Sequence, residues 1–287
     1  MARKGNLIVV EEQAEMVRQR KKLPAPLALI PTMGALHDGH LSLIKTARDR
    51  GANSIIVTIF VNPTQFAPGE DFAKYPRPLH DDLQHLAGAG VELVWIPLVA
   101  TIYPPDYSTL IVVPDLSHSF EGEIRPHHFT GVATVVTRLL RLIKPDLAVF
   151  GEKDYQQLLI IRRLVRDLEL GVEIVSAPIF RNPRGLALSS RNQYLSDSGY
   201  IQAANLSRVL FETGINLRSG KEISECIKKA NRSLKSAGFT KIDYFDLVVD
   251  GTLDLVKTKS LDESSPPTRM LAAARLEGIR LLDNWLV

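Results

Sequence analysis

Two histidines three residues apart, in the segment "PTMGALHDGH", are the first side chains along the chain with an evident chemical use. His37 and His40 follow an apolar run that stops at Pro31, and an apolar pattern typical of a helix starts again after His40. A turn from a strand into a helix presents backbone N–H groups and the positive end of the helix dipole to an anion. The pattern therefore favours contact of both imidazoles with a phosphate.

Two other interpretations of the histidine pair stay open. A zinc site would need a third ligand at helical spacing, as in the H-E-x-x-H pattern, and Asp38 between the histidines would point elsewhere. Alternatively, the two rings could satisfy loop hydrogen bonds and cap the helix. Gly34 and Gly39 suit the phosphate interpretation, because glycine lets the backbone approach a ligand closely.

Polar residues also follow two later apolar runs that we expect to be strands. Asn62 and Gln65 lie in "NPTQF", and Lys153, Asp154 and Gln157 lie in "GEKDYQQ". In an open α/β sheet, ligands bind beyond the carboxyl ends of the strands, so these segments should share one edge with the histidines. Together they would suit a polyoxygenated anionic ligand. An isolated loop lysine is equally a solvated surface charge.

The segment "GLALSSRN" is a second candidate anion site. Ser189, Ser190 and Arg191 follow a short apolar run near the expected junction of two domains. Alone, this pattern is also that of a turn followed by a helix cap. Beside a pair of phosphate-binding histidines, it predicts a loop that closes over a departing pyrophosphate.

Four further residues have two interpretations each. Arg125 in "EIRPHHF" and Tyr75 in "DFAKYPR" lie in expected loops, where they either contact a substrate or belong to the plain surface. The carboxylates of Asp81 and Asp82 could hold Mg²⁺, or they could complement the dipole at a helix N-terminus.

The elements that must position these residues alternate between strand and helix through the first 180 residues. This order predicts an α/β fold with a Rossmann-like open parallel sheet and helices on both faces. We expect strands at 27–30, 54–61, 91–96, 147–150 and 172–175, and helices at 40–50, 79–89, 129–143 and 155–168. The proline-containing region 103–128 is an apparent insertion, with a possible extra strand at 109–113.

The pattern changes after about residue 178. Two helices, at 198–218 and 222–237, are followed by strands at 242–249, 270–274 and 279–282. Helices followed by strands predict a smaller C-terminal α+β domain with a short antiparallel sheet. We therefore expect a nucleotide-binding domain at 1–179 and a smaller lid domain at 180–287.

Composition excludes several other classes of protein. The chain of 287 residues has a net charge of +3, too small to indicate nucleic-acid binding. Its single cysteine, Cys226, excludes an internal disulfide and a thiolate zinc cluster and fits a reducing cytoplasm. We expect neither a signal peptide nor a membrane span.

Taken together, the motifs resemble the pantothenate synthetase (pantoate–β-alanine ligase) family of the nucleotidyltransferase superfamily. The resemblance spans residues 6–284 in order and is carried by "PTMGALHDGHLSLI", "IFVNPTQF", "DFAKYPR", "IYP", "EGEIRPHHFTGV", "FGEKDYQQL", "GLALSSRNQYL" and "AAARLEGIRLLDN". His37–His40 correspond to the HIGH signature of the superfamily. The resemblance implies an ATP-dependent ligation through pantoyl adenylate, with Mg²⁺, in a cytoplasmic homodimer.

The resemblance also implies a role for each candidate residue. His37 and His40 would stabilise the α-phosphate, with His40 as the proton donor, and Lys153, Ser189, Ser190 and Arg191 would balance the β- and γ-phosphates. Gln65 and Gln157 would bind pantoate, and Asn62, Tyr75 and Arg125 are further candidates for the pantoate and β-alanine sites. The expected ATP-binding residues include, besides those, Pro31, Thr32, Met33, Gly34, Ala35, Leu36, Asp38, Gly39, Gly151, Glu152, Asp154, Phe180 and Leu188.

Some positions depart from the family pattern. His127 stands where a glycine is usual, Thr130 where an arginine is usual, and Asn182–Arg184 replace a more acidic run. These changes concern the closing of a flap and dimer contacts near the expected helix 129–143. Two rivals remain: a nucleotidyltransferase that leaves AMP on its product, and a nucleotide-binding regulator without catalysis. The neutral pair Gln65 and Gln157 favours a small hydroxy acid over a phosphorylated acceptor.

Overall fold

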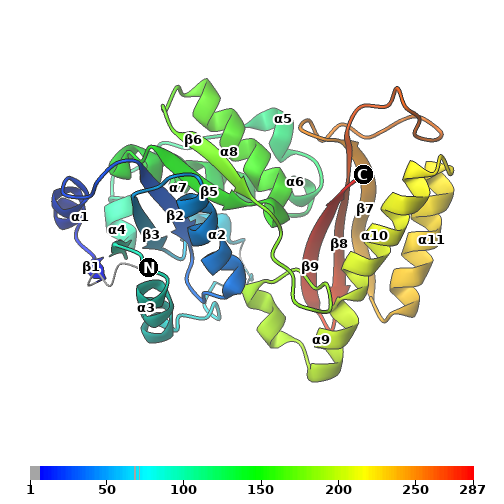
Figure 1. Ribbon diagram of the computed structural model, residues 1–287, viewed down its shortest axis with the longest axis horizontal. Helices are drawn as coiled ribbons and strands as arrows, with labels where there is room; N and C mark the ends of the chain where they lie inside the picture. The colour runs from blue at the N-terminus through cyan, green and yellow to red at the C-terminus, as the bar shows by residue number, and fades with distance from the viewer. Residues whose placement is uncertain (1–6, 68, 71) are drawn as a thin grey trace. The chain divides into compact units, whose positions relative to one another are not determined.

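The computed structural model describes residues 7–67, 69–70 and 72–287, and in it the chain forms two compact units (Figure 1). The first unit comprises residues up to 152 together with 156–178, and the second comprises 153–155 and 179–287. The sequence did not predict that residues 153–155 pack with the second unit. Within the described ranges, no helix combines the length and apolarity needed to cross a bilayer.

The first unit contains a six-stranded parallel sheet in the order β1-β4-β3-β2-β5-β6. Its strands are β1 (Ile8–Val10), β2 (Leu27–Thr32), β3 (Ser54–Ile59), β4 (Leu93–Trp95), β5 (Leu147–Gly151) and β6 (Glu173–Ala177). Its helices are α1 (Gln13–Arg20), α2 (Asp38–Asp49), η1 (Pro63–Gln65), α3 (Leu79–Gly88), α4 (Val99–Ile102), α5 (Pro114–Ser117), α6 (Glu121–Ile124), α7 (His128–Ile143) and α8 (Tyr155–Asp167), with η2 (Glu152–Asp154) at the junction of the units. The expected Rossmann-like fold is confirmed.

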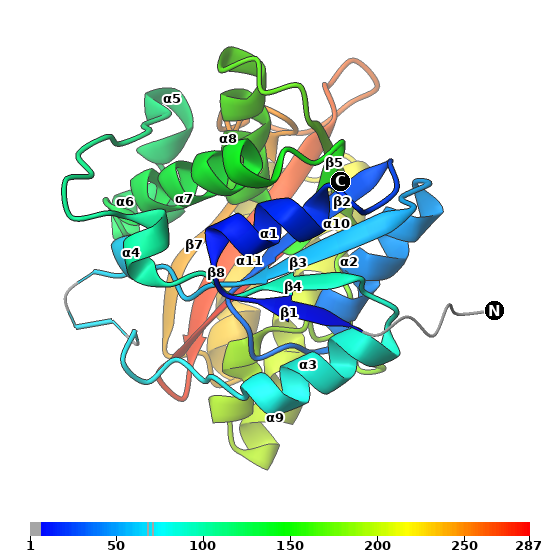
Figure 2. The ribbon, with the colours of Figure 1, turned by 90° about the vertical axis from the view of Figure 1, so that its left-hand side faces the viewer.

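Helices cover both faces of this sheet. On one face, apolar residues of α2 and α3 form a buried cluster with β2, β3, β5 and β6. On the other face, α1 and α7 pack against each other and against the strands, and Figure 2 shows α1 crossing in front of them. Because both faces are covered, β2 and β3 are almost continuously buried, which explains why their apolar runs were readable in the sequence.

The second unit is an antiparallel sheet covered by helices on one face (Figure 1). Its strands are β7 (Lys241–Val249), β8 (Thr268–Leu276) and β9 (Ile279–Leu286), and its helices are η3 (Ser190–Tyr194), α9 (Asp197–Ala203), α10 (Asn205–Arg218) and α11 (Ile223–Ser236). Alternate residues of β8, Met270, Ala272 and Ala274, join the core formed with α10 and α11. The expected small α+β domain is confirmed.

Three local predictions need correction. The possible strand at 109–113 does not form: Ile111 N–H donates to the Thr134 hydroxyl at 3.0 Å rather than to another strand. The single helix expected at 198–218 is divided into α9 and α10 at Ala204. The sequence also missed β1 and α1, because β1 has only three residues and α1 buries only Met16.

Candidate active site

His37 and His40 hold each other and the start of α2 in a reciprocal cap. His37 is the N-cap residue, and its Nδ1 accepts the backbone N–H of Gly39 at 3.1 Å. In return, the backbone N–H of His37 donates to Nδ1 of His40 at 3.3 Å. The ring centroids are 4.1 Å apart. The capping role that the sequence left as an alternative is therefore present.

This cap determines where each imidazole carries its proton. Because both Nδ1 atoms accept backbone N–H groups, the neutral rings of His37 and His40 are protonated at Nε2. Both rings are half-buried at the N-terminus of α2, where the helix dipole also favours an anion. Capping and phosphate binding are thus compatible, since they use opposite sides of the ring. Phosphate contact itself stays a prediction.

The loop ahead of the histidines is braced by a buried carboxylate. Asp82, 1% exposed in the first turn of α3, accepts the backbone N–H of Ala35 at 2.9 Å and that of Leu36 at 2.7 Å. At the start of the loop, Thr32 Oγ1 accepts Gly34 N–H at 3.2 Å and donates to the Thr58 carbonyl at 2.7 Å. The path of the chain between β2 and α2 is consequently held from two neighbouring elements.

The backbone of this loop lies in a conformation that requires glycine at one position. Gly34 has φ of +78° and Ala35 has φ of +50°. A Cβ atom on Gly34 would lie 2.9 Å from Asp82 Oδ2 and 3.1 Å from Ile59 Cγ2. Gly34 is therefore needed both for its left-handed backbone and for the close approach of the Asp82 carboxylate.

The two acidic residues considered for Mg²⁺ have different environments. Both oxygens of Asp82 are used by backbone N–H groups in a buried position, which does not suit a magnesium ligand. Asp81 is exposed on the same helix turn. In the described part of the chain, no three His, Cys, Asp or Glu residues are grouped so that they could hold a metal ion. The structure gives Asp82 a role in bracing the histidine loop.

The loops after β2 and β3 meet through Gln65 and Met33. The Gln65 amide nitrogen donates to Met33 Sδ at 3.2 Å, and its oxygen accepts from Asn62 Nδ2 at 3.1 Å. Asn62 is 1% exposed, and its oxygen accepts the Tyr103 hydroxyl at 2.8 Å. Asn62 therefore fixes the loop that carries Gln65. The predicted convergence of these two strand ends is present in the first unit.

Arg125 and Tyr75 both have partners within the first unit, and their contact with a substrate stays a prediction. The Arg125 guanidinium pairs with both oxygens of Glu70 at 2.8 Å and lies 3.3 Å from the Gln65 carbonyl. Burial tends to raise the pKa of Glu70, but hydrogen bonding and the charge of Arg125 outweigh it and leave that pKa lowered. Tyr75 is 5% exposed and packs edge-on against Phe66.

The end of β5 leaves room beside Gly151. A Cβ atom at this position would meet only Leu43 Cδ2, at an ordinary 3.9 Å. Gln157, predicted to bind pantoate, is half-buried in the first turn of α8. Its neighbour Gln156 is buried and donates to the carbonyls of Leu116 and Ser119, so the two adjacent amides have different environments.

The second unit contains the other predicted phosphate-binding residues. Lys153 Nζ lies 3.3 Å from Asp154 Oδ1, and the lysine side chain is 19% exposed. Ser189 Oγ caps η3 by accepting Arg191 N–H at 3.4 Å, and Ser190 and Arg191 are half-buried in its first turn. The segment thus forms the turn and helix cap that the sequence left as an alternative. Whether these side chains contact phosphate stays a prediction.

A short hairpin leads into this serine–arginine loop. Leu188 N–H donates to the Phe180 carbonyl at 3.0 Å, and Arg181 pairs with Ala187 in an antiparallel bridge. Asn182 Oδ1 accepts the N–H groups of Arg184 and Leu186, both at 3.0 Å. The atypical "NPR" segment is therefore a self-capped turn, and Phe180 is 41% exposed at its base.

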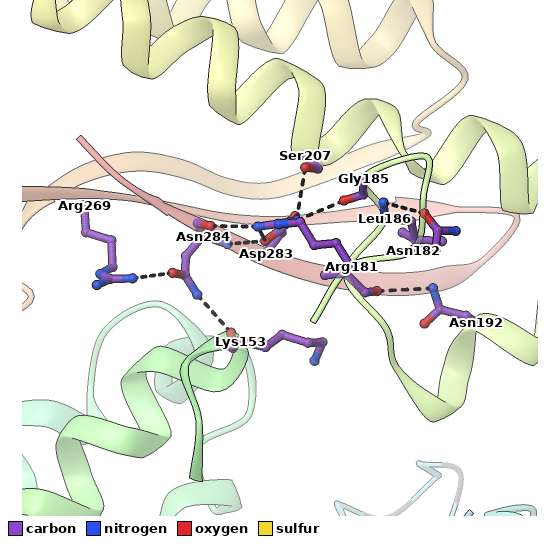
Figure 3. A network of polar contacts seen from close by, with 11 residues as sticks. Lys153, Arg181, Asn182, Gly185, Leu186, Asn192, Ser207, Arg269, Asp283 and Asn284 are labelled. Atoms are coloured by element: carbon purple, nitrogen blue, oxygen red, sulfur yellow. Dashed lines mark hydrogen bonds and ion pairs between the residues drawn. The ribbon is translucent and has the colours of Figure 1, made fainter. Parts of the chain in front are cut away.

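Sequence reasoning missed a polar network in the second unit (Figure 3). Arg181 makes two hydrogen bonds to the Asp283 carboxylate, at 2.7 and 2.8 Å, and Asp283 is 4% exposed. Burial raises the pKa of Asp283, although Arg181 opposes the shift. The adjacent Asn284 donates to the Lys153 carbonyl at 3.1 Å and accepts from Arg269 at 2.7 Å. The only sequence signal for this network was the polar pair "DN" inside an apolar strand.

Comparison with known proteins matches this arrangement to one family. The model of the family described as pantoate–β-alanine ligase matches residues 8–286. The pantothenate synthetase of Rhizorhabdus wittichii is 47% identical over 278 residues, covering 97% of this chain and 96% of that protein.

Solved structures match nearly the whole chain. The pantothenate synthetase of Thermus thermophilus is 41% identical, with a TM-score of 0.89 over 97% of this chain and 98% of that one. The pantoate–β-alanine ligase of Francisella tularensis, solved with beta-gamma ATP and β-alanine, is 33% identical, with a TM-score of 0.78 over 98% of this chain and 97% of that one. The protein whose histidine loop, Gln65 loop and serine–arginine loop are described above belongs to the pantoate–β-alanine ligase family.

Proposed function

We propose that the protein joins pantoate to β-alanine at the expense of ATP. In the first step, an oxygen of the pantoate carboxylate attacks the α-phosphorus of ATP, which forms pantoyl adenylate and releases pyrophosphate. In the second step, the amine of β-alanine attacks the acyl carbon, which forms pantothenate and releases AMP. The supporting relatives are pantothenate synthetases that match nearly the whole chain, and one was solved with a form of ATP and β-alanine.

The observation that carries this proposal is the reciprocal cap between His37 and His40. It makes Nε2 the protonated nitrogen of both rings, at a helix N-terminus. Two such N–H donors suit the α-phosphate, whose charge grows as the carboxylate attacks. Donors held in place before the reaction stabilise that charge without reorganisation. We assign His40 as the proton donor, as the family resemblance implies.

The remaining roles follow the chemistry of each side chain. The neutral amides of Gln65 and Gln157 are assigned to pantoate, because an uncharged partner leaves the carboxylate nucleophilic. Lys153, Ser189, Ser190 and Arg191 are assigned to the β- and γ-phosphates, for which charged donors give the stronger hydrogen bonds. The backbone from Pro31 to Gly39 and around Gly151 is assigned to ribose and adenine. Exclusion of water protects the adenylate from hydrolysis.

Mg²⁺ belongs to this proposal as a companion of ATP. The buried oxygens of Asp82 do not fit it, as described above. Protein sites commonly bind Mg²⁺ through one or two carboxylates together with substrate phosphates, so the phosphates of ATP supply its main ligands. Of the two aspartates predicted to bind Mg²⁺, the exposed Asp81 is the one that stays a candidate ligand.

A cytoplasmic homodimer completes the proposal. Helix α7, expected at the dimer surface, is largely buried within the first unit. Leu110 and Val112, in the segment before it, are 63% and 52% exposed and are better candidates for contact with a second copy. Light scattering of the protein and of a variant with Leu110→Asp and Val112→Asp tests this: the double substitution should yield monomers.

One experiment separates the proposal from its rivals. With ATP, Mg²⁺ and pantoate, the protein should release pyrophosphate and retain the adenylate; addition of β-alanine should then release AMP. A transferase that leaves AMP on its product would release pyrophosphate but no AMP. A regulator would bind ATP and release neither, so an absence of pantoate-dependent pyrophosphate would overturn the ligase proposal.

A further inference from the structure

Two consecutive residues of β9 contact Lys153 and the hairpin that leads into the serine–arginine loop, whose side chains are assigned with Lys153 to the β- and γ-phosphates. Asp283 accepts two hydrogen bonds from Arg181, which belongs to the hairpin leading into the serine–arginine loop. Asn284 donates from Nδ2 to the backbone carbonyl of Lys153 at 3.1 Å. Figure 3 shows Arg181 and Lys153 reaching this pair from separate stretches of chain. Thus one dipeptide connects both segments.

The geometry of a β-strand explains why the adjacent residues Asp283 and Asn284 contact different segments of the chain. Successive side chains of a β-strand point to opposite faces of the sheet. Leu281 and Trp285 of β9 contribute to the core that α10 and α11 form with the sheet, so Asp283 lies on that face. Accordingly, Arg181 also donates to Ser207 of α10 at 3.0 Å. Asn284 lies on the opposite face.

On that opposite face, the segment 153–155 is held at two points. Besides the bond from Asn284 to the Lys153 carbonyl, the Tyr155 hydroxyl donates to Asp250 at 2.5 Å and accepts Gly251 N–H at 2.8 Å. Arg269 connects the two points: it donates to Asn284 Oδ1 and to Asp250 Oδ1, both at 2.7 Å. Its guanidinium also lies 4.1 Å from the centre of the Tyr155 ring.

These bonds constrain the backbone from which the lysine side chain departs. The Asn284 side chain can be satisfied only while its oxygen faces Arg269 and its nitrogen faces the Lys153 carbonyl. The Arg269 side chain is 8% exposed, so this orientation is fixed inside the protein. Catalytic groups must be placed within fractions of an ångström, and their supporting hydrogen bonds provide that accuracy.

We propose that Asn284 is a positioning residue for Lys153, and that Asp283 and Asn284 together set Lys153 against the serine–arginine loop for binding of the pyrophosphate part of ATP. This inference rests on the proposed function, in which Lys153 contacts the β- and γ-phosphates. Asn284 acts through the lysine backbone and touches no reacting atom. Its loss should therefore slow adenylate formation without altering the affinity for pantoate.

Asn284 is a better residue to test than Asp283. Removal of Asp283 would leave the guanidinium of Arg181 without its buried partner, and breaking such a pair is strongly destabilising. Asn284→Asp changes less: one carboxylate oxygen still accepts from Arg269, and the donor to the Lys153 carbonyl is lost. The matched control is Asn216→Asp, because Asn216 of α10 also donates its amide to a backbone carbonyl, that of Glu212 at 2.8 Å.

The measured quantity is the single-turnover rate of pyrophosphate release with saturating ATP, Mg²⁺ and pantoate. Asn284→Asp should lower this rate about tenfold or more, since one lost hydrogen bond is worth about one factor of ten. The KM for pantoate should stay within about twofold, and Asn216→Asp should leave the rate unchanged. No loss of rate in Asn284→Asp, or an equal loss in both variants, would overturn the inference.

A second arm asks whether Asn284 acts through Lys153. Lys153→Ala should itself be slow, and in that background Asn284→Asp should add less than a further twofold loss, because coupled residues are not additive. A full additional loss in that background would show a general structural role and refute the proposal. If Asn284→Asp does not fold, Arg269→Lys replaces it, since lysine cannot make both of the arginine's bonds.

The remaining outcomes are equally decisive. If Asn284→Asp and Arg269→Lys both unfold the protein, these residues maintain the fold, and the positioning role is rejected. The proposed function fails separately: in that case the unmodified protein itself releases no pyrophosphate in response to pantoate. A normal unmodified enzyme with unaffected Asn284→Asp rejects only the inference.

Discussion

The carboxylate of Asp82 accepts the backbone N–H of Leu36 at 2.7 Å, across 46 residues of sequence. Its other oxygen accepts the N–H of Ala35 at 2.9 Å. A buried carboxylate thereby orders the loop that delivers His37 and His40 to the start of α2. Substitution of Asp82 should destabilise this loop, because the loss of its acceptor oxygens would leave the buried N–H groups of Ala35 and Leu36 unsatisfied.

Asp82→Asn should slow adenylate formation. One amide oxygen remains as an acceptor, but the NH₂ group then faces a backbone donor, which should cost about 1–3 kcal/mol. If the cost falls on the barrier, pyrophosphate release slows about tenfold to a hundredfold. Stopped-flow measurement of pyrophosphate checks this. An exposed aspartate elsewhere provides the control: Asp197→Asn also removes a carboxylate from the first turn of a helix, α9, and should retain most activity.

Gly34→Ala should lower the stability of the protein more than the matched substitution Gly90→Ala does. Its Cβ would lie 2.9 Å from Asp82 Oδ2, and φ is +78°. At Gly90, φ is +74° but no described atom lies within 4 Å of the added Cβ. Both variants carry the backbone cost of about 1–2 kcal/mol. Chemical denaturation should therefore show a larger decrease in the free energy of unfolding for Gly34→Ala than for Gly90→Ala. Equal decreases would mean that the Asp82 side chain moves away from the added Cβ without destabilising the protein.

Separate substitutions of the two histidines should divide their roles. Asn places its amide oxygen near the position of Nδ1, so His37→Asn and His40→Asn keep the cap and remove the Nε2 donor. Each should lower the rate of pyrophosphate release by about 10²–10³, the usual effect of losing one such donor. The larger effect is expected at His40. Thermal unfolding should change little; a large drop in Tm would point to a structural role instead.

Tyr155 should make stability fall at high pH. Burial, followed by the hydrogen bond to Asp250 and its charge, raises the pKa of Tyr155 from 10.0 to about 12. Between these values the unfolded chain releases the phenolic proton while the native protein keeps it. The free energy of unfolding should therefore decrease as pH rises through this window. Urea titrations at several pH values should show a shallower decrease in Tyr155→Phe and no change in slope for exposed Tyr194→Phe.

Much of the fold was readable because burial leaves a direct mark on sequence. The strands β2, β3 and β5 are covered on both faces, so each appears as a continuous apolar run. Helix α7 shows the apolar period of a helix that packs on a core. Thr109–Val113 misled this reasoning, because its β-branched residues lie in an irregular segment with Leu110 and Val112 exposed.

The sequence by itself determined the family, the parallel sheet, and the order of the segments that bear the candidate chemistry, since all of these depend on local pattern and on residue types. Only the tertiary structure decided what individual polar residues do. An acidic residue at a helix N-terminus has the same local pattern whether it binds a metal, faces water or braces a distant loop, as Asp82 does. Likewise, nothing near Asn284 in sequence reveals its bond to the Lys153 carbonyl, 131 residues away. Such partners are selected by packing, because a buried polar group must find its hydrogen bonds wherever the fold brings them.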